Sequence, residues 1–356
     1  MRCGRAKLGT VPFMCIVFSQ VPEEKLNVSY VPRRIYKYRA FSGRVLDMLV
    51  ADRLYFSDPA DFNDPLDSRP NVEGDIPAAE LERILSRLVE LRIEAEMTIA
   101  ASSLKYRGPK TIDHIARHSR KRADSLINKI RYNARDPAYE MEDPEHFLLT
   151  QYLEEELLRR YGIGIVSCGS RATCPLMWSH YGDQHRGICA GYSVPDDAVS
   201  KLKKIAYGGS RNVKASDVDA MTREPAARQR VDEAVLLRKA RSWNYEREWR
   251  LIGNRGLQES SLELEEVIFG IRCNSPVKYT IFRALENRPR RVQVYEMREQ
   301  RGTFRLLKCR LDSEELGASL PRRARDLADA FSNLDIADAA QQALHDHDPA
   351  SGVPKP

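Results

Sequence analysis

Two glutamates, Glu246 and Glu248, lie in the chemically densest stretch of the chain, the run WNYEREWR at residues 243–250. If residues 245–252 form a strand, its two-residue period places Glu246, Glu248 and Arg250 on one face. Carboxylates crowded in this way repel each other, which raises the pKa of one of them. Such a group can act as a general base or bind a sugar hydroxyl, so Glu246 and Glu248 are candidate catalytic residues and Arg250 a candidate ligand contact.

The same run also has a purely structural interpretation. Arg247 and Arg250 can neutralise the two acids along a solvated edge strand, because ion-pair networks perturb titration as well. The sequence leaves both interpretations open.

A second cluster, Tyr-Lys-Tyr-Arg at residues 36–39, is predicted to lie on a strand. The strand period places Tyr36 and Tyr38 on one face and Lys37 and Arg39 on the other. The planar guanidinium of Arg39 suits a phosphate or a carboxylate. We therefore expect Arg39 and Tyr38 to contribute to ligand binding.

A third cluster is the predicted loop at residues 61–67. Asn63 and Asp64 can hydrogen-bond nearby backbone, and Pro65 fixes its own φ. Turn formation explains most of this pattern, and direct ligand binding by Asn63 or Asp64 is the alternative.

A fourth cluster occupies residues 177–187, between two predicted strands. His180 can orient a ligand or transfer a proton, and Ser179, Tyr181 and His185 are candidate ligand contacts. The alternative for His180 is a hydrogen-bonded core residue, since no GxSxG context is present. His180 and His185 miss the HExxH spacing and the cysteines complete no zinc pattern, so no metal is expected.

Composition limits the classes of protein and partner. The 356 residues carry a net charge of +6, and residues 311–356 hold nine acids against four bases, so the preceding part has a charge of about +11. A basic domain favours nucleotides or nucleic acid, although an Arg-rich composition gives the same value without them. The seven scattered cysteines fit a reduced, cytoplasmic setting. No apolar run is long enough to span a membrane, and no P-loop or GxGxxG motif is present.

The predicted fold class is α+β, with a small mixed, largely antiparallel β-sheet core, a helical insertion and a C-terminal helix. Leucine and isoleucine at helical spacing predict two helices within residues 78–135, and Asp143 with Pro144 starts a third. The second helix carries many Lys and Arg residues, which form either a solvated face or a surface that faces a nucleic acid or a nucleotide. The predicted parts are an N-terminal extension (1–30), the main domain (31–310) with its insertion (78–161), a C-terminal helical segment (311–344) and a disordered tail (345–356).

Taken in order, these motifs and the segment Val267-Ile268-Phe269-Gly270 resemble the DUF2971 family of prokaryotic and phage proteins. The resemblance covers about residues 33–310. This chain has Gly182 where the family usually has Ala, and its helical insertion is longer. The family's activity is not established, so the resemblance implies kinship more than chemistry.

The order of the motifs is also similar to that of ADP-ribosyltransferase-like enzymes, at the level of fold analogy. That similarity implies that Arg39 binds the pyrophosphate of NAD, that Tyr181 stacks on nicotinamide, and that Glu248 holds the ribose and stabilises an oxocarbenium-like transition state. Glu246 would orient or deprotonate the acceptor. These roles require Arg39, Tyr181 and Glu248 to line one cleft.

The leading hypothesis is therefore an NAD-dependent ADP-ribosyltransferase or NAD glycohydrolase acting in conflict between phage and bacteria, on a protein or nucleic-acid acceptor. A metal-independent nuclease and a non-catalytic nucleotide-binding or interaction module are the alternatives. In each case the expected ligand is small and anionic or a nucleotide, and no membrane partner is expected.

Overall fold

The computed structural model describes residues 31–106 and 108–322. The expected N-terminal extension, the C-terminal helix beyond residue 322 and the tail lie outside the described residues. Contacts divide the chain into Met1–Pro32 and Arg33–Pro356. All described helices and strands belong to the second unit.

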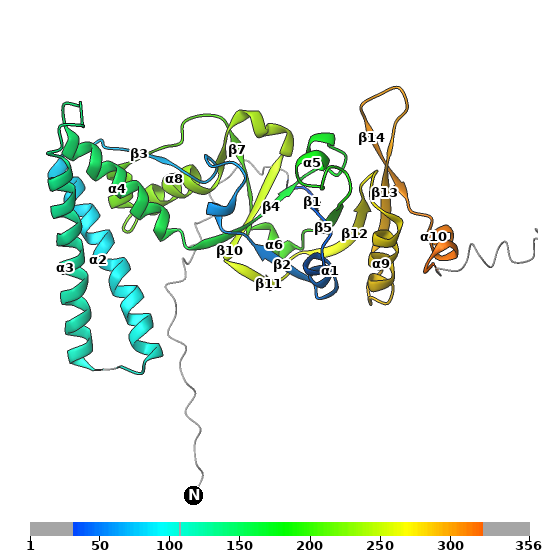
Figure 1. Ribbon diagram of the computed structural model, residues 1–356, viewed down its shortest axis with the longest axis horizontal. Coiled ribbons are helices and arrows are strands. Elements are labelled where there is room, and N and C mark those ends of the chain that lie inside the picture. The colour runs from blue at the N-terminus through cyan, green and yellow to red at the C-terminus, as the bar shows by residue number, and fades with distance from the viewer. Residues whose placement is uncertain (1–30, 107, 323–356) are drawn as a thin grey trace, which may run out of the picture. The chain divides into compact units, whose positions relative to one another are not determined.

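An eight-stranded sheet forms the centre of this unit (Figure 1). Its strands follow the order β14-β13-β12-β5-β1-β4-β10-β6, and every pairing is antiparallel except that of β12 with β13. The α+β class and the mixed, largely antiparallel sheet are thereby confirmed. The strands are β1 (Arg34–Arg39), β4 (Ile163–Gly169), β5 (Ile188–Ser193), β6 (Leu202–Lys204), β10 (Glu248–Asn254), β12 (Glu263–Phe269), β13 (Gln293–Glu299) and β14 (Leu306–Arg310).

Three two-stranded sheets flank the central one and were not predicted as pairs. Antiparallel β2 and β11 form one of them, and the parallel pairs β3 with β8 and β7 with β9 form the others. Their bounds are β2 (Arg53–Phe56), β11 (Gly256–Glu259), β3 (Asn71–Glu73), β8 (Asn212–Lys214), β7 (Ala206–Tyr207) and β9 (Arg238–Lys239).

The helical insertion consists of α2 (Ala78–Ser103), α3 (Pro109–Asn133) and α4 (Pro144–Arg160). Helix α4 begins as predicted, because the Asp143 carboxylate accepts a hydrogen bond from the backbone N–H of His146. The apolar stripes of the three helices meet in a core that also contains residues of α7 (Ala215–Ala220) and α8 (Pro225–Leu236). The insertion therefore shares its core with a segment that lies more than fifty residues further along the chain.

Two short helices cover opposite faces of the central sheet. Helix α1 (Gly43–Val50) packs on the face to which Arg39 belongs. Helix α5 (Pro175–His180) packs on the other face, where the buried ring of Trp178 meets Tyr38 edge-on with the ring centroids 5.2 Å apart. The remaining helices are α6 (Asp196–Val199), α9 (Ser275–Leu285), α10 (Ser313–Ser319) and the 3-10 turns η1 (Pro59–Asp61) and η2 (Arg241–Glu246).

Residues 245–252 do not form one continuous strand, so the condition under which Glu246, Glu248 and Arg250 share a strand face is not met. Residues up to Glu246 belong to η2, Arg247 adopts a left-handed conformation with φ 47°, and β10 begins only at Glu248. The 3-10 turn allows Trp243 and Tyr245 to pack against His180. From Glu248 onward the strand prediction is confirmed.

Within residues 31–106 and 108–322, no helix has the length and apolar character needed to cross a membrane.

Candidate functional site

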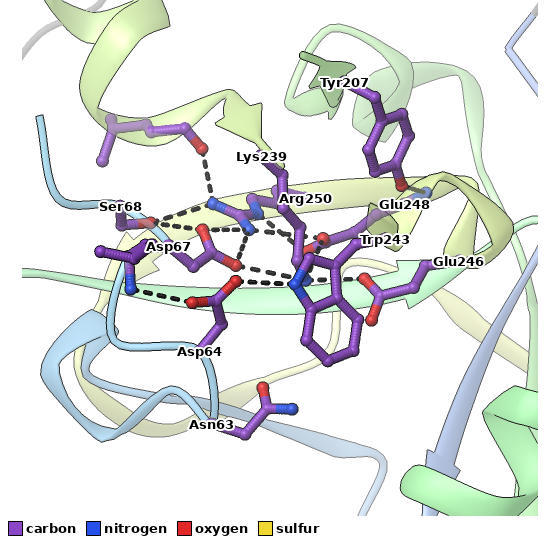
Figure 2. A network of polar contacts seen from close by, with 12 residues as sticks. Asn63, Asp64, Asp67, Ser68, Tyr207, Lys239, Trp243, Glu246, Glu248 and Arg250 are labelled. Carbon is purple, nitrogen blue, oxygen red and sulfur yellow. Dashed lines mark hydrogen bonds and ion pairs between the residues drawn. The ribbon is translucent and has the colours of Figure 1, made fainter. Parts of the chain in front are cut away.

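Arg250 lies at the centre of a buried polar network (Figure 2). Its guanidinium donates to both carboxylate oxygens of Asp67, at 2.8 and 2.7 Å, and its Nε donates to Oε1 of Glu248 at 2.7 Å. The Ser68 hydroxyl and the Leu236 carbonyl accept from Nη1 at 3.0 and 2.7 Å. With its side chain fully buried, Arg250 is saturated by protein partners and has no free donor for a ligand.

Lys239 links this network to the second glutamate. Its ammonium lies 2.6 Å from Oε2 of Glu246, 3.1 Å from Oε2 of Glu248 and 3.2 Å from Oδ2 of Asp67. Strand β9 carries Lys239 beside Tyr207, whose hydroxyl accepts from the backbone N–H of Glu248 at 2.7 Å. The two glutamates thus meet through one cation, although they are not on a common strand.

The network contains three carboxyl groups and two cations, all at most 7% exposed. Burying charge is costly unless each charge has a partner, so the surplus carboxyl must be accommodated in another way. Burial raises the pKa of Glu246 above the ordinary carboxyl range, although Lys239 opposes the shift. Of the two glutamates, Glu246 therefore has the higher tendency to hold a proton.

Glu248 behaves in the opposite sense. Burial alone would raise its pKa, but the charges of Arg250 and Lys239 outweigh burial and hold the pKa of Glu248 below its ordinary range. Burial would likewise lower the pKa of Lys239, yet the carboxylates of Glu248 and its neighbours raise it. Glu248, Lys239 and Arg250 consequently form ion pairs at neutral pH. Arg250 does pair with Glu248, as the structural interpretation expects. Strand β10 lies between β4 and β6 and is not an edge strand. The cation that pairs with Glu246 is Lys239 and not Arg247.

Tyr181 connects Glu246 to the surface. Its hydroxyl donates to Oε1 of Glu246 at 2.8 Å and accepts from the side-chain amide of Asn63 at 3.1 Å. Tyr181 is half-buried and Asn63 is exposed. Burial, followed by the charge of Glu246, raises the pKa of Tyr181, so this hydroxyl remains a donor. Tyr181 therefore links the buried carboxyl of Glu246 to the exposed side chain of Asn63.

Aromatic rings surround the side chain of Tyr181. His180 lies 6.3 Å from Tyr181, 6.1 Å from Trp243 and 6.3 Å from Tyr245, measured between ring centroids. Trp243 donates its indole N–H to Asp64 at 2.7 Å and lies under the ammonium of Lys239, 5.2 Å from the ring centroid. His180, Tyr181, Trp243 and Tyr245, together called the aromatic cluster below, are exposed or partly exposed residues. A planar ligand ring can stack there.

Asn63 and Asp64 therefore have more than a turn-forming role. Asp64 does form the predicted turn, because its carboxylate accepts from the backbone N–H of Leu66 at 2.9 Å. Its other oxygen holds Trp243 in place. The loop thus positions one edge of the aromatic cluster.

Ser179 and His185 form a separate pair beside this site. Nε2 of His185 lies 3.3 Å from the Ser179 hydroxyl, which donates to the Pro175 carbonyl at 3.0 Å. The imidazole stacks on Trp178, and its buried Nδ1 has no hydrogen-bond partner among the described residues. Burial and the charge of Arg272 lower the pKa of His185. This arrangement has no carboxylate to orient the imidazole, as a nucleophilic triad requires.

The single cleft lined by Arg39, Tyr181 and Glu248 does not form. Tyr38 belongs to the same core cluster as Tyr181, whereas Arg39 lies on the opposite face of the sheet beside α1. Burial lowers the pKa of Arg39 there. Tyr38 is itself buried, and its hydroxyl donates to the Arg171 carbonyl at 2.7 Å. Its ring packs against Trp178 of α5, so Tyr38 stabilises the position of this helix.

Lys239, Asp67 and Trp243 were not predicted as site residues, although Trp243 contacts Asp64 and Lys239. Lys239 follows α8 without any motif, so no local signal distinguishes it. Asp67 stands in the same loop as Asn63 and Asp64, and its proximity to them was the available signal. Within the described ranges, no three His, Cys, Asp or Glu side chains lie close enough together to hold a metal ion.

Residues 177–251 match the sequence model of DUF2971, described as a protein of unknown function. This stretch begins in α5 and ends in β10, so it contains Tyr181, Lys239, Glu246, Glu248 and Arg250. The similarity to this family therefore covers most of the buried network, while Asn63, Asp64 and Asp67 lie outside the match. No curated protein and no solved structure matches the chain.

Proposed function

We propose that this protein is an NAD-consuming enzyme, an ADP-ribosyltransferase or NAD glycohydrolase, with its reaction centre at Tyr181 and Glu246. The observation that carries the proposal is the series of hydrogen bonds from Tyr181 through Glu246 to Lys239, which links a half-buried tyrosine beside the aromatic cluster to a buried carboxyl. Because Glu246 bonds to half-buried Tyr181 whereas Glu248 bonds to buried Arg250, these hydrogen bonds support Glu246 as the catalytic glutamate.

The proposed ligand contacts are the side chains around Tyr181. The aromatic cluster offers ring faces for nicotinamide. Asn63 and Tyr181 offer hydrogen bonds to ribose hydroxyls. In this proposal Arg39 no longer binds the pyrophosphate, and exposed Arg247, next to Glu246 in the chain, takes that role through its bidentate donors.

In the proposed reaction, the bond between the nicotinamide nitrogen and ribose C1′ breaks, and nicotinamide leaves with the bonding electron pair. The ionised carboxylate of Glu246 stabilises the positive charge that develops at C1′. Water or an acceptor hydroxyl then attacks C1′ and passes its proton to Glu246, whose raised pKa suits a base. Lys239 and Tyr181 hold the carboxylate in position throughout.

The cellular setting in this proposal is a reducing cytoplasm. The described cysteines Cys168, Cys174, Cys189, Cys273 and Cys309 are all free thiols, which is compatible with it. A role in conflict between phage and bacteria remains part of the same proposal.

The test is nicotinamide release from NAD by the purified protein, compared with the variants Glu246→Gln and Tyr181→Phe. Glu246→Gln should lower the rate at least a hundredfold, and Tyr181→Phe about tenfold, in line with the loss of charge stabilisation or of one hydrogen bond. Tyr161→Phe is the matched control, because Tyr161 also donates its hydroxyl to a carboxylate, Asp232 at 2.6 Å, but lies in the insertion core.

Two results would overturn the proposal. The first is a wild-type protein that releases no nicotinamide but cleaves RNA or DNA without added metal, which supports a nuclease. The second is NAD binding, seen as a thermal shift, without turnover on any acceptor, which supports a nucleotide-binding module.

A further inference from the structure

Helix α3 carries an excess of positive charge that the fold does not use. It contains seven Lys and Arg residues against two Asp, a net charge of +5 over its 25 residues. Among its basic residues, Arg131 alone forms ion pairs with described side chains, with Glu82 at 2.7 Å and Glu145 at 3.6 Å. The exposed cations without an ion pair to any described side chain are Lys110, Arg117, Arg120, Lys121, Arg122 and Lys129.

These cations lie on the side of α3 that faces away from its helical neighbours. The opposite side, which includes Ile115, Ala123 and Ile130, is buried against α2 and α4. Arg117 and Lys121 are four residues apart and so lie next to each other. Like charges at this spacing destabilise a helix, and neither acid of α3, Asp113 or Asp124, forms a salt bridge with them. The arrangement therefore disfavours the isolated helix and suits an anionic partner.

The dimensions of α3 indicate what kind of anion it fits. A helix of 25 residues is about 37 Å long, close to the roughly 34 Å of one DNA helical turn. The α2–α3 pair lies at one end of the ribbon, to one side of the central sheet (Figure 1). Membrane binding by an amphipathic helix requires an exposed apolar face. The apolar face of α3 is buried, and exposed apolar side chains such as Leu104 and Ile112 gather at the hairpin tip instead.

We propose that the exposed face of α3 binds the phosphate backbone of a double-stranded nucleic acid. Its lysines and arginines contact successive phosphates and release bound counterions, so affinity depends on charge and salt more than on base sequence. This binding surface is independent of the NAD chemistry proposed for Glu246.

The experiment measures fluorescence anisotropy of labelled DNA and RNA duplexes of about 20 base pairs, roughly two helical turns, with the full chain at about 50 and 200 mM salt. The variant Arg117→Glu/Lys121→Glu should lose at least tenfold in affinity, and the slope of log K against log salt should fall by about 2. The control Arg301→Glu/Arg305→Glu makes the same change in net charge at exposed residues of the turn between β13 and β14, and should lose less than about threefold. The DNA and RNA arms show which duplex is preferred.

Three outcomes would overturn the inference. In the first, the wild-type protein binds neither duplex at low salt. In the second, both variants lose affinity equally. In the third, the protein binds phosphatidylserine vesicles more tightly than either duplex, and Arg117→Glu/Lys121→Glu abolishes that binding. Circular dichroism of each variant shows whether the helices are retained. If Arg117→Glu/Lys121→Glu does not fold, the milder Arg117→Gln/Lys121→Gln is measured in its place against Arg301→Gln/Arg305→Gln.

Discussion

Glu246 and Glu248 share the ammonium of Lys239, at 2.6 and 3.1 Å, although the left-handed residue between them prevents a continuous strand. The two carboxyls differ in their remaining partners. Glu248 is bound by Arg250, whereas Glu246 accepts from the neutral hydroxyl of Tyr181. Because their partners differ, the pKa of Glu246 is raised and that of Glu248 is lowered. Experiments can therefore separate the roles of the two glutamates.

Removal of Lys239 should strongly destabilise the fold. Lys239→Met leaves three buried carboxyls with only Arg250 to balance them, and loss of one partner from a buried ion pair costs about 3–5 kcal/mol. Urea unfolding at neutral pH measures the loss. Lys278→Met is the control, because the pair of Lys278 with Glu296 is partly exposed and its loss should cost about 1 kcal/mol or less. Equal losses in the two variants would contradict the assigned importance of the network.

The two glutamates should give opposite dependences of stability on pH. The folded state raises the pKa of Glu246, so above the ordinary carboxyl value of about 4.3 it retains a proton that the unfolded chain releases. The contribution of Glu246 to stability is therefore full below that value and declines as pH rises through its folded pKa. The folded state lowers the pKa of Glu248, so its contribution is full above the ordinary value and is lost as pH falls towards its folded pKa.

Unfolding of Glu246→Gln and Glu248→Gln between pH 3 and 8 tests this contrast. Relative to wild type, Glu246→Gln should gain stability as pH rises from about 4.3 towards neutrality. Glu248→Gln should be about 3–5 kcal/mol less stable at neutral pH, and the deficit should shrink in acid. Parallel pH profiles for the two variants would show that the carboxyls are equivalent.

The backbone at Arg247 should tolerate glycine better than a branched residue. Its φ of 47° lies in the left-handed region, which costs an L-residue roughly 1–2 kcal/mol and costs glycine nothing. Arg247→Gly should therefore leave stability unchanged or raise it by about 0.5 kcal/mol, while Arg247→Val should lower it by about 1–2 kcal/mol. Thermal unfolding of the pair is the measurement. Equal stability of the two variants would mean that residue 247 is not left-handed.

Only part of this site follows from the sequence. The period of two correctly pairs Glu248 with Arg250, and the same period already separates Tyr38 from Arg39. The expected cleft required Arg39 to lie on the same face of β1 as the α5 side, where Tyr181 lies. Which face of β1 meets α1 and which meets α5 is decided by tertiary packing, and Arg39 lies on the α1 side. Lys239 reaches the glutamates because the chain reverses between α8 and β10, and no local pattern encodes that distance. The three helices of the insertion were predictable from periodicity and the Asp143 cap, whereas the polar partners of the glutamates were not.

Gly270 should be intolerant of a side chain. A Cβ at this position would collide with the carbonyl oxygen of His185, in a turn where Asp183, Gln184 and His185 all have positive φ. Gly270→Ala should therefore lower stability by about 1–3 kcal/mol and displace the turn that follows α5. Gly43→Ala is the control, because a Cβ there meets nothing within 4 Å and Ala favours a helix. The midpoint of urea unfolding is measured for both variants. An unchanged midpoint for Gly270→Ala would contradict the close contact between position 270 and the His185 carbonyl.

Trp243 should report ligand binding by its fluorescence. The chain has three tryptophans, and Trp178 and Trp249 are buried at 0% and 5% exposure, which leaves Trp243 as the one at the aromatic cluster. A nicotinamide or adenine ring stacked there should quench its emission. Trp243→Phe keeps an aromatic face but removes the fluorophore and the hydrogen bond to Asp64. The quench should disappear, while calorimetry should show an affinity about 2–10-fold weaker, the value of one lost hydrogen bond. A quench that persists in Trp243→Phe would place the ligand elsewhere.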